Sequence, residues 1–542
     1  MTSRAIIESK SDKSEVVIVG AGPTGLLAAC QLARYGVKFR IIEKNKGPTT
    51  QSRALAIHAA SMEMFLQIGI ADNFVRLGKK VQAVNYFVKG KVEQRIPLSE
   101  FGKGATQFPF LLILEQSKSE KLLIDFLERR GHKVEWETEL VDFSQGDDNV
   151  KVVVKNSGIE ETIQADWLVG ADGARSQVRQ ILDIPFAGQT YPIDLFVLDC
   201  RVNWNLKEDE MYIAFSDHSF AGFFPMPEGR CRVIGFVPKE AALKEEITFE
   251  DVNNGFADRM QMKIKLYDPS WISMYHSHHR YVSQFKIGRC FLAGDSAHIH
   301  SPVGAQGMNT GLQDAFNLAW KLAVVIKKWA KKDLLNTYQE ERLPFARRLV
   351  RSTDRAFNMT ASQKGLMKYM RMHIAPRILA ILLKIKPVER FLFRNISQIG
   401  ISYRDGLLSA NGKDTGFGSS APKPGERLPY LEFEDRLGQR VNIQKRVDAT
   451  SLHLFIFSSF SKDADEELIK FLEQYKGVIT YESILFTPAT RELYKNLDIM
   501  EGGLYLIRPD LYIAYRSQSF DLDGLKNYLQ LFLILNYNRK GM

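Results

Sequence analysis

The sequence predicts an α/β protein that begins with a nucleotide-binding unit. Residues 16–19 form a short apolar run typical of a buried parallel strand, and a G-x-G-x-x-G pattern follows at residues 20–25. Residues 26–36 have helical periodicity and end in glycine, and a second apolar stretch ends at Glu43. A strand, a glycine turn, a helix and a second strand in this order predict a parallel sheet that binds a dinucleotide.

Each glycine of the pattern has its own physical role in such a unit. Gly20 permits the tight turn, Gly22 lets the backbone approach a pyrophosphate, and Gly25 lets the helix pack closely on the strand. The N-terminus of the helix offers oriented N–H groups to the anion. Glu43 can accept hydrogen bonds from the ribose of adenosine. These residues predict dinucleotide binding without distinguishing NAD from FAD.

Two segments farther along the chain repeat the signal of a strand that ends at a turn. They read "DWLVGADGARSQVRQIL" at residues 166–182 and "GRCFLAGDSAHIHSPVGAQGMNTGLQDA" at residues 288–315. A cofactor held by the first glycine pattern and also by such distant segments has a second part that is bound separately. This requirement favours FAD, whose ribityl chain and ring extend beyond its adenosine.

The motifs together resemble those of a known enzyme family. With "SRALAIHAASMEMF" at residues 52–65 and "LLILEQSKSEKLL" at residues 111–123, the chain resembles the FAD-dependent aromatic hydroxylases. These are single-component flavoprotein monooxygenases related to phenol and p-hydroxybenzoate hydroxylases. The resemblance implies a Rossmann-type FAD-binding domain of the glutathione-reductase-like kind, interleaved with a β-sheet substrate domain. A thioredoxin-like α/β domain is implied at the C-terminus.

The resemblance also assigns cofactor contacts. Asp295 matches the acid that binds the ribityl hydroxyls, and the alternative for this residue is a helix N-cap. Backbone N–H groups at a helix start match those that face the pyrimidine carbonyl of the flavin, where their dipoles would stabilise the charge of the reduced ring. That helix start is Gly307, Met308 and Asn309; the other matches are Arg53 and Gln116 for FAD, Asp172 for FAD and NAD(P)H, and Pro302 beside the flavin ring.

Residues 185–285 predict the substrate side of the protein. They alternate or run apolar between turn residues, which indicates strands. In the family, this region forms a sheet over the flavin and carries much of the pocket, although strand aromatics also serve as ordinary core residues. No catalytic side chain is assigned, because the flavin carries the chemistry. The candidate lining residues are Tyr212, Phe215, Phe223, Phe224, Pro225, Met226 and Pro302.

The sequence departs from the family at two positions. Many members carry arginine where this chain has Ala60, and phenol hydroxylases have an active-site acid where it has Leu55. Phenol itself is therefore disfavoured as a substrate, and a larger ligand is expected. Arg175 and Arg179 are candidates for contacting the phosphates of a nicotinamide cofactor, with solvated helix residues as the alternative. No second glycine pattern follows a strand, so NADPH or NADH is expected to bind transiently.

The resemblance implies an NAD(P)H-consuming monooxygenase. Hydride transfer reduces FAD, dioxygen forms a flavin hydroperoxide, and one oxygen atom passes to a phenolic or polyketide-like aromatic ring. An antibiotic-inactivating monooxygenase is an alternative within the same chemistry. A flavin reductase or oxidase without oxygen transfer is a second alternative, and a ligand-sequestering flavoprotein is a third from outside the enzymes.

The resemblance, with a Pro- and Gly-rich linker near residues 421–430, implies four parts of the chain. An FAD-binding domain comprises residues 1–184 and 286–350, and a substrate-binding sheet comprises residues 185–285 with part of 80–112. A helical segment covers residues 351–415, and a thioredoxin-like domain without redox cysteines covers residues 416–542. Within the helical segment, "RILAILLKIKPVERFLF" at residues 377–393 is apolar and basic. Packing against other helices is expected there rather than contact with a membrane, because a proline interrupts it.

Composition limits the remaining possibilities. The 73 basic and 63 acidic residues give a net charge of +10, but no dense basic cluster with interleaved aromatics predicts nucleic-acid binding. Four scattered cysteines predict neither a disulfide framework nor a zinc site, and they suit the cytoplasm. The histidines of residues 276–300 lack a completing carboxylate or cysteine in sequence, so no metal is predicted. No apolar run is long enough to span a membrane, and a homodimer is one arrangement that the sequence allows.

Overall fold

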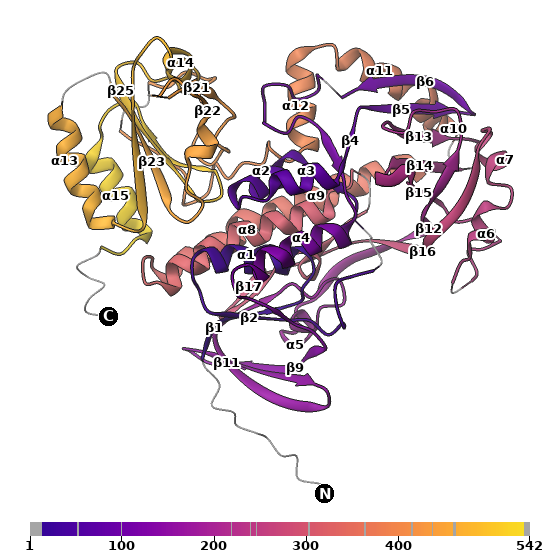
Figure 1. The fold of residues 1–542 in the computed structure, drawn as a ribbon, viewed down its shortest axis with the longest axis horizontal. Helices are drawn as coiled ribbons and strands as arrows, with labels where there is room; N and C mark the ends of the chain where they lie inside the picture. The colour runs from indigo at the N-terminus through magenta and orange to yellow at the C-terminus, as the bar shows by residue number, and fades with distance from the viewer. Residues whose placement is uncertain are drawn as a thin grey trace, which may run out of the picture.

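The computed structural model describes residues 13–50, 54–98, 100–217, 219–238, 240–244, 246–301, 304–361, 365–413, 416–435, 437–458 and 462–535. Three main sheets organise this mixed α/β chain, and helices join or cover them (Figure 1). The first two sheets adjoin one another. The third belongs to the C-terminal part of the chain, which forms a separate lobe beside α8 and α9 (Figure 1).

The first sheet contains the strand predicted at residues 16–19. Its central strands run parallel, and their residues are almost all buried, which explains why they read as continuous apolar runs. An antiparallel hairpin extends the long strand β11, and a short strand adds to β18. The order is β17 (Lys286–Ile287), β18 (Cys290–Leu292), β11 (Ile159–Gly170), β1 (Ser14–Val19), β2 (Phe39–Ile42) and β8 (Val134–Glu135), with β10 (Val150–Asn156) on β11 and β9 (Thr138–Gln145) on β10.

Helices α1 (Pro23–Arg34), α4 (Gln116–Glu128) and α8 (Gly307–Ile326) pack together beside this sheet (Figure 1). Helix α1 begins with proline in its first turn and is followed by Gly36 at a φ of +67°, the arrangement that suits a helix start and stop. The smaller elements near these helices are β3 (Ala56–Ile57), α2 (Ala59–Gln67), α3 (Ala71–Leu77), β4 (Lys79–Val81), β7 (Leu111–Ile113) and α5 (Gln177–Ile181).

The second sheet is formed largely by the strands predicted within residues 185–285. It is antiparallel except where β13 pairs with β5, and short helices α6 (Phe249–Asn253) and α7 (Phe256–Met260) cover one of its faces. Its order is β19 (His298–Ile299), β16 (Lys265–Val282), β12 (Phe186–Asn203), β15 (Cys231–Phe236), β14 (Phe220–Pro225), β13 (Met211–Phe215), β5 (Ala83–Val88) and β6 (Lys91–Pro97).

A long helix and three shorter ones follow the first two sheets. They are α9 (Asn336–Ala361), α10 (Gly365–Tyr369), α11 (Ala375–Leu382) and α12 (Lys386–Ile396), and a single π-helical turn at Met370–Ile374 joins α10 to α11. The expectation that residues 377–393 pack against other helices is wrong for much of this segment, because several of its large apolar side chains are exposed. The break expected at Pro387 is present, between α11 and α12.

The C-terminal sheet mixes parallel and antiparallel pairings. Its order is β20 (Ala410–Asn411), β26 (Ile513–Ser517), β25 (Gly502–Ile507), β23 (Leu452–Ser458) and β24 (Ile479–Leu485), with helices α13 (Lys462–Leu472), α14 (Arg491–Leu497) and α15 (Leu522–Phe532) and a hairpin of β21 (Glu432–Glu434) and β22 (Arg440–Asn442). Cys30, Cys200, Cys231 and Cys290 are buried free thiols. Every helix within the described ranges is too short or too polar to cross a membrane.

Candidate functional site

Three segments that are far apart in the sequence end at one edge of the first sheet. Strands β1, β11 and β18 lie side by side and parallel, so their carboxyl ends meet there. Backbone hydrogen bonds join the ends: the Ala171 N–H donates to Val19 O at 2.8 Å, and the Ala293 N–H donates to Gly170 O at 3.0 Å. The edge of a parallel sheet beyond its carboxyl ends is the usual place for a bound nucleotide.

The turn after β1 contains three glycines of the pattern. At two of them a side chain would collide with the backbone, and at the third there is room for one. A Cβ atom on Gly20, whose φ is +102°, would lie 2.4 Å from Ala171 O, and one on Gly25 would lie 2.0 Å from Gly20 O. At Gly22, a Cβ atom would meet no atom within 4 Å. The chain itself therefore requires glycine at 20 and 25. Glycine 22 instead leaves backbone facing open space, which fits a pyrophosphate approaching the start of α1.

Glu43 follows β2 and contacts the backbone of this turn. Its Oε2 accepts a hydrogen bond from the Ala21 N–H at 3.0 Å, and its Oε1 accepts one from the Asn45 N–H at 3.0 Å. Gln116, at the start of α4, accepts from the Ala54 N–H at 3.1 Å through Oε1. It thereby ties α4 to the segment that follows Arg53, a residue that itself lies outside the described part of the chain.

Asp172 and Arg179 hold the second motif together. The Ser176 hydroxyl donates to Oδ1 of Asp172 at 2.6 Å, and the Val178 N–H donates to Oδ2 at 3.1 Å, so Asp172 ties down the N-cap Ser176 and the first turn of α5. Burial raises the pKa of this carboxyl. Arg179 is buried and donates to Ser296 O at 2.9 Å, which links the second motif to the third. This role of Arg179 differs from both predictions for it, a contact with the phosphates of a nicotinamide cofactor and a solvated helix residue. Arg175, for which the same two alternatives were predicted, is exposed.

Asp295 lies exposed in a single 3₁₀ turn, Gly294–Ser296, that follows β18. It is inside the turn rather than at an N-cap. The turn is anchored on both sides, because the Ser296 hydroxyl donates to Gly170 O at 2.6 Å and the Gly294 N–H donates to Oδ2 of Asp314 at 3.0 Å. A Cβ atom on Gly294 would lie 2.6 Å from Oγ1 of Thr24, so the start of α1 packs against this turn.

Asp314 is a fully buried carboxylate that the sequence analysis missed. Besides the Gly294 N–H, it accepts a hydrogen bond from Nε of Arg342 at 2.6 Å, and Nε2 of His298 lies 2.7 Å from its Oδ2. Burial favours the protonated acid, but the charges of Arg342 and His298 outweigh burial and lower its pKa. A signal was present in the sequence, because Asp314 and Lys321 are the charged residues in the otherwise apolar or neutral stretch of α8.

The start of α8 is fixed through the side chain of Asn309. Its Oδ1 accepts from the His58 N–H at 2.9 Å and from the Ser61 hydroxyl at 2.7 Å, and its Nδ2 donates to Ala56 O at 2.9 Å. The polar atoms of this side chain are thus hydrogen-bonded to β3 and to the start of α2. Backbone N–H groups in the first turn of α8, at Gly307, Met308 and Asn309, remain the groups that suit a ligand there. Pro302 lies outside the described residues.

The candidate substrate residues lie on two faces of the second sheet. Tyr212 and Phe223 are paired across β13 and β14 and are buried in the cluster under α6 and α7. The Tyr212 hydroxyl donates to Lys207 O at 3.0 Å, and burial raises its pKa to about 12. Phe224 follows Phe223 and therefore points to the opposite face. Pro225 is buried beside it, and Phe215 packs in a third cluster.

Phe224 belongs to an apolar cluster that joins the second sheet to the cofactor side. It packs with Met226 and with Leu55, Ile113 and Ala305, which come from the segments around β3, β7 and the start of α8. Leu55, one of the two positions where the sequence was expected to depart from the family, thus lies in this cluster. The cluster connects the face of Phe224 with the region that precedes α8.

A buried ion pair lies next to Phe224 on the same face of the sheet. Arg232 is directly opposite Phe224 in β15, and its guanidinium donates two hydrogen bonds, each of 2.7 Å, to the carboxylate of Asp199. The guanidinium also lies 5.5 Å from the ring centre of Trp271. Within the described residues, the indole Nε1 of Trp271 is buried without a hydrogen-bond partner. Sequence reasoning did not single out these three residues.

Comparison with known proteins identifies the family. A family model described as "FAD binding domain" matches residues 13–353. The chain belongs to this family. Over 540 residues it is 31% identical to 6-methylpretetramide 4-monooxygenase of Streptomyces rimosus, covering 97% of this chain and 95% of that protein. It is also 31% identical over 437 residues to pentachlorophenol 4-monooxygenase of Sphingobium chlorophenolicum, covering 79% and 78% of the two chains.

A solved structure agrees with this assignment at the level of the fold. The flavin-dependent monooxygenase PieE in complex with FAD and substrate matches with a TM-score of 0.81 and 21% identity, covering 96% of this chain and 100% of that one. The chain is therefore a flavin-dependent monooxygenase with an FAD-binding domain, and FAD is its cofactor. The resemblance to the FAD-dependent aromatic hydroxylases is confirmed.

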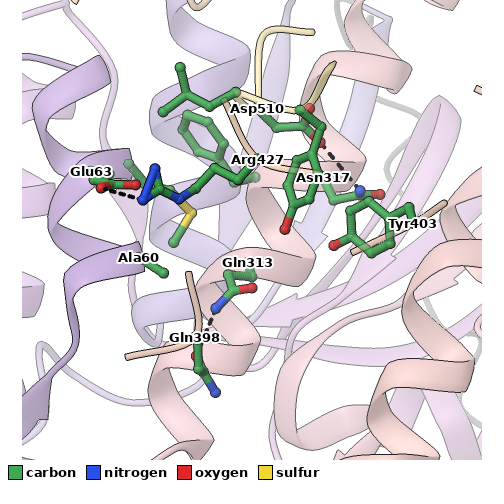
Figure 2. Close-up of a pocket in the computed structure, with 12 residues that line it drawn as sticks. Ala60, Glu63, Gln313, Asn317, Gln398, Tyr403, Arg427 and Asp510 are labelled. Carbon is green, nitrogen blue, oxygen red and sulfur yellow. Dashed lines mark hydrogen bonds and ion pairs between the residues drawn. The ribbon is translucent and has the colours of Figure 1, made fainter. Parts of the chain in front are cut away.

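A pocket elsewhere in the molecule lies between α2, α8 and loops of the C-terminal lobe (Figure 2). Arg427 reaches across it to Glu63, with NH2 of Arg427 3.2 Å from Oε1 of Glu63. Within the described residues, Oε2 of Glu63 and Nε of Arg427 are buried without hydrogen-bond partners. Ala60 also lines the pocket, so a larger side chain at this position would fill space that alanine leaves open.

His276 and His278, for which no metal site is predicted, lie close to other polar side chains. Nδ1 of His276 lies 2.6 Å from Oδ1 of Asp194, and Nδ1 of His278 lies 2.8 Å from the Thr190 hydroxyl. In the part of the chain that the structure describes, no three His, Cys, Asp or Glu side chains gather as they would around a metal ion.

Proposed function

We propose that FAD lies along the shared edge of β1, β11 and β18, and that the chain uses it to hydroxylate an aromatic small molecule. The observation that carries the proposal is the convergence of the three motifs at one sheet edge. Gly20, Gly22 and Gly25 would hold the pyrophosphate against the start of α1, and Glu43 would meet the adenosine ribose. Gln116 and Arg53 would contact the same cofactor.

The far end of FAD is assigned to the third motif. Asp295, exposed beside the anchored Gly294 turn, would accept hydrogen bonds from the ribityl hydroxyls. The first turn of α8 would face the pyrimidine carbonyl of the ring with the N–H groups of Gly307, Met308 and Asn309. Asp172 would contact FAD and NAD(P)H, and the hydrogen bonds that its carboxylate accepts from Ser176 and Val178 hold it at the sheet edge. Pro302 would lie beside the ring.

Within this arrangement, bound FAD supplies the activation of dioxygen once NADPH or NADH has reduced it. The residues of the chain position the reactants, exclude water and hold charge. Helix-end N–H groups at the start of α8 stabilise negative charge without moving. The apolar cluster of Leu55, Phe224 and Ala305 keeps water away from the adjoining region, which protects a reactive flavin from side reactions.

The substrate is proposed to be a phenolic or polyketide-like aromatic compound larger than phenol. Two relatives are named for 6-methylpretetramide and for pentachlorophenol, and both names denote aromatic monooxygenases. Leu55 supplies no charge where phenol hydroxylases have an acid. On the same face of the sheet as Phe224, Nε1 of Trp271 has no hydrogen-bond partner within the described residues and would offer one donor next to the Arg232–Asp199 pair. An oxygen-bearing, mainly apolar aromatic molecule suits such a wall.

The domain organisation remains part of the proposal. Residues 1–184 and 286–350 are assigned to a Rossmann-type FAD-binding domain of the glutathione-reductase-like kind, and residues 185–285 with part of 80–112 to the substrate sheet. Residues 351–415 form the helical segment. Residues 416–542 are assigned to a thioredoxin-like domain, supported by the mixed order of β26, β25, β23 and β24 with flanking helices. The sequence has no cysteine after Cys290, so this domain has no dithiol chemistry.

The test is oxidation of NADPH and NADH by the FAD-loaded protein across a panel of phenols, quinones and aromatic polyketides, with product masses recorded. We expect one class of compound to accelerate oxidation and to gain one oxygen atom. Oxidation that yields only hydrogen peroxide across the panel would indicate an oxidase or a pseudo-substrate. An oxygenated product with small phenols alone would contradict the proposed substrate class.

A further inference from the structure

The helical segment after α9 exposes a stripe of large apolar side chains. Helix α10, the π-helical turn and α11 follow one another without interruption from residue 365 to residue 382. Leu366 and Tyr369 are 73% and 58% exposed, and Ile378, Ile381 and Ile385 are 49%, 62% and 47% exposed. The last three are spaced three and four residues apart, so they lie on one side of α11 and the turn that follows it.

Helix α12, which follows α11 in the chain, also exposes large apolar side chains. Phe391 is 66% exposed and Ile396 is 45% exposed. The opposite side of the same helix is buried, with the ring of Phe393 5.2 Å from that of Phe101. The helix therefore packs on the protein through the side that carries Phe393, and Phe391, two residues earlier, points away from that side. Soluble monomers rarely expose large apolar side chains in such a group, and those that do use them for binding. We call this surface the α10–α12 face.

The α10–α12 face is also strongly basic. Between residues 365 and 396 there are seven lysines and arginines and one carboxylate, Glu389, a formal charge of +6 in a chain whose total is +10. Lys368 and Arg377 pair with Asp217 and Glu93, which lie outside this segment, and Lys386 pairs with Glu389. Lys384, Arg390 and Arg394 are exposed. Within the described ranges, none of these three makes an ion pair. Their charges are thus available to an outside partner.

We propose that the α10–α12 face docks on the surface of an anionic lipid bilayer. Helices with apolar side chains on one side and lysines and arginines around them lie in the plane of a membrane interface, with the apolar side chains at the headgroup boundary. Anionic lipids attract the basic side chains, each of which strengthens binding by about fivefold. The helices lie on the membrane and do not cross it.

Charge decides between a membrane and a second copy of the chain. A symmetric dimer through this face would place the same patch on both sides of the interface. It would then bring Lys384, Arg390 and Arg394 of one copy towards the same three residues of the other, and within the described ranges none of the three has a carboxylate partner. Like charges brought together in this way oppose association. An anionic bilayer satisfies the apolar and the basic side chains at the same time.

The face is attached to the second sheet, which determines what docking brings near the lipid. Arg377 pairs with Glu93 of β6 at 3.0 Å, and Met372 packs with Val88 and Phe215. Figure 1 shows α11 beside β5 and β6, on the side of the molecule away from the amino-terminal end of the chain. Docking would therefore hold the second sheet close to the membrane, whether or not the proposed substrate is correct.

The test uses the FAD-loaded, full-length protein and vesicles. We expect it to co-sediment with vesicles of phosphatidylcholine and phosphatidylglycerol, to bind vesicles of phosphatidylcholine alone far less, and to dissociate as salt shortens the screening length. The double variant Ile381→Glu/Phe391→Glu should lose binding. The variant Lys384→Gln/Arg390→Gln should bind about 25-fold more weakly, at about fivefold per charge. Both should keep their FAD content.

The matched control places similar changes on the C-terminal lobe. Leu437 is 80% exposed and Lys445 is exposed, and the variant Leu437→Glu/Lys445→Gln should bind vesicles as the unmodified protein does. Failure of the unmodified protein to bind anionic vesicles would overturn the proposal, as would binding that both face variants retain. If the apolar variant instead turns a dimer into a monomer and no vesicle binding is seen, the face is a contact between copies of the chain.

Discussion

Asp295 offers the sharpest test at the scale of one residue. Its carboxylate is exposed while the backbone around it is anchored, so its removal should leave the fold intact. A hydrogen bond to a charged group contributes about 1.5–3 kcal/mol. We therefore expect Asp295→Ala to weaken FAD binding by about 10- to 100-fold, measured by flavin fluorescence titration. The control is Asp148→Ala, which removes another exposed carboxylate; equal flavin retention in both variants would contradict the assignment.

His300 predicts how stability depends on pH. It is buried close to the start of α8, and burial lowers its pKa to about 4. The unfolded chain binds a proton near the ordinary histidine pKa of about 6.5, whereas the folded chain does not until about pH 4. Stability from this group is thus present above pH 6.5 and is lost as the pH falls toward 4, by about 3 kcal/mol in total.

The variant His300→Asn removes this titration. Urea unfolding of the apo-protein at pH 7 and at pH 4.5 should show a smaller acid-induced loss of unfolding free energy for the variant than for the unmodified protein. An identical loss in both proteins would show that His300 does not titrate in this way.

At the scale of elements, the turn between β1 and α1 separates folding from binding. We expect Gly25→Ala to destabilise the apo-protein by at least about 1–3 kcal/mol, because its Cβ would lie 2.0 Å from Gly20 O. Gly22→Ala meets no atom within 4 Å and should change apo-protein stability by less than about 0.5 kcal/mol. It should nevertheless weaken FAD binding at least about tenfold, because the methyl group occupies the space for the pyrophosphate.

Denaturant unfolding of the two apo-proteins and flavin titration of Gly22→Ala check this pair. Each variant is the control for the other, because both place an alanine in the same turn, three residues apart. If Gly22→Ala bound FAD normally, the cofactor would not approach the backbone at this turn.

Elements were predictable where a local pattern determines them. The strand, glycine turn and helix from residue 14 to residue 34 follow from adjacent residues and were foreseen. Alternation in β14 also predicts that Phe223 and Phe224 point to opposite faces, but not which face adjoins the cofactor side. The packing of α11 against other helices was predicted wrongly. A run of apolar and basic residues shows that part of a helix surface is apolar, but it does not determine whether another element covers that part.

At the scale of the whole molecule, a buried charge cluster joins the C-terminal lobe to α8 and α9. Arg508 donates to Glu341 of α9 at 2.5 Å and 2.9 Å and to Asp510 at 2.6 Å, and Lys321 of α8 donates to Glu341 at 2.8 Å. Burial alone would raise the pKa of Glu341, but Arg508 and Lys321 hold it at about 2. Glu341 precedes Arg342, which binds Asp314 and so reaches the Gly294 turn.

Removing the cation should weaken the attachment of the lobe. In Arg508→Leu, buried Asp510 loses its cation and Glu341 keeps Lys321 as its cation, and breaking a buried pair costs about 3–5 kcal/mol. We expect calorimetry to show a lower Tm and a separate transition for the C-terminal lobe. The control is Arg446→Leu, whose partly exposed pair with Glu482 lies within the lobe and should contribute less than about 1 kcal/mol. Similar transitions in both variants would contradict a joining role.

The sequence by itself determined the order of the motifs, the cofactor class and the strands that carry them. Glycine turns, helix starts and buried strands depend on neighbouring residues, so a single chain displays them. Only the tertiary structure decided the ties among Asp314, Arg342 and Gly294, the Arg508–Glu341 contact between lobes, and the uncovered α10–α12 face. Such contacts join residues that are distant in sequence. Which residue pairs with a buried charge, and whether an apolar side chain is covered, depends on how the folded chain brings distant segments together.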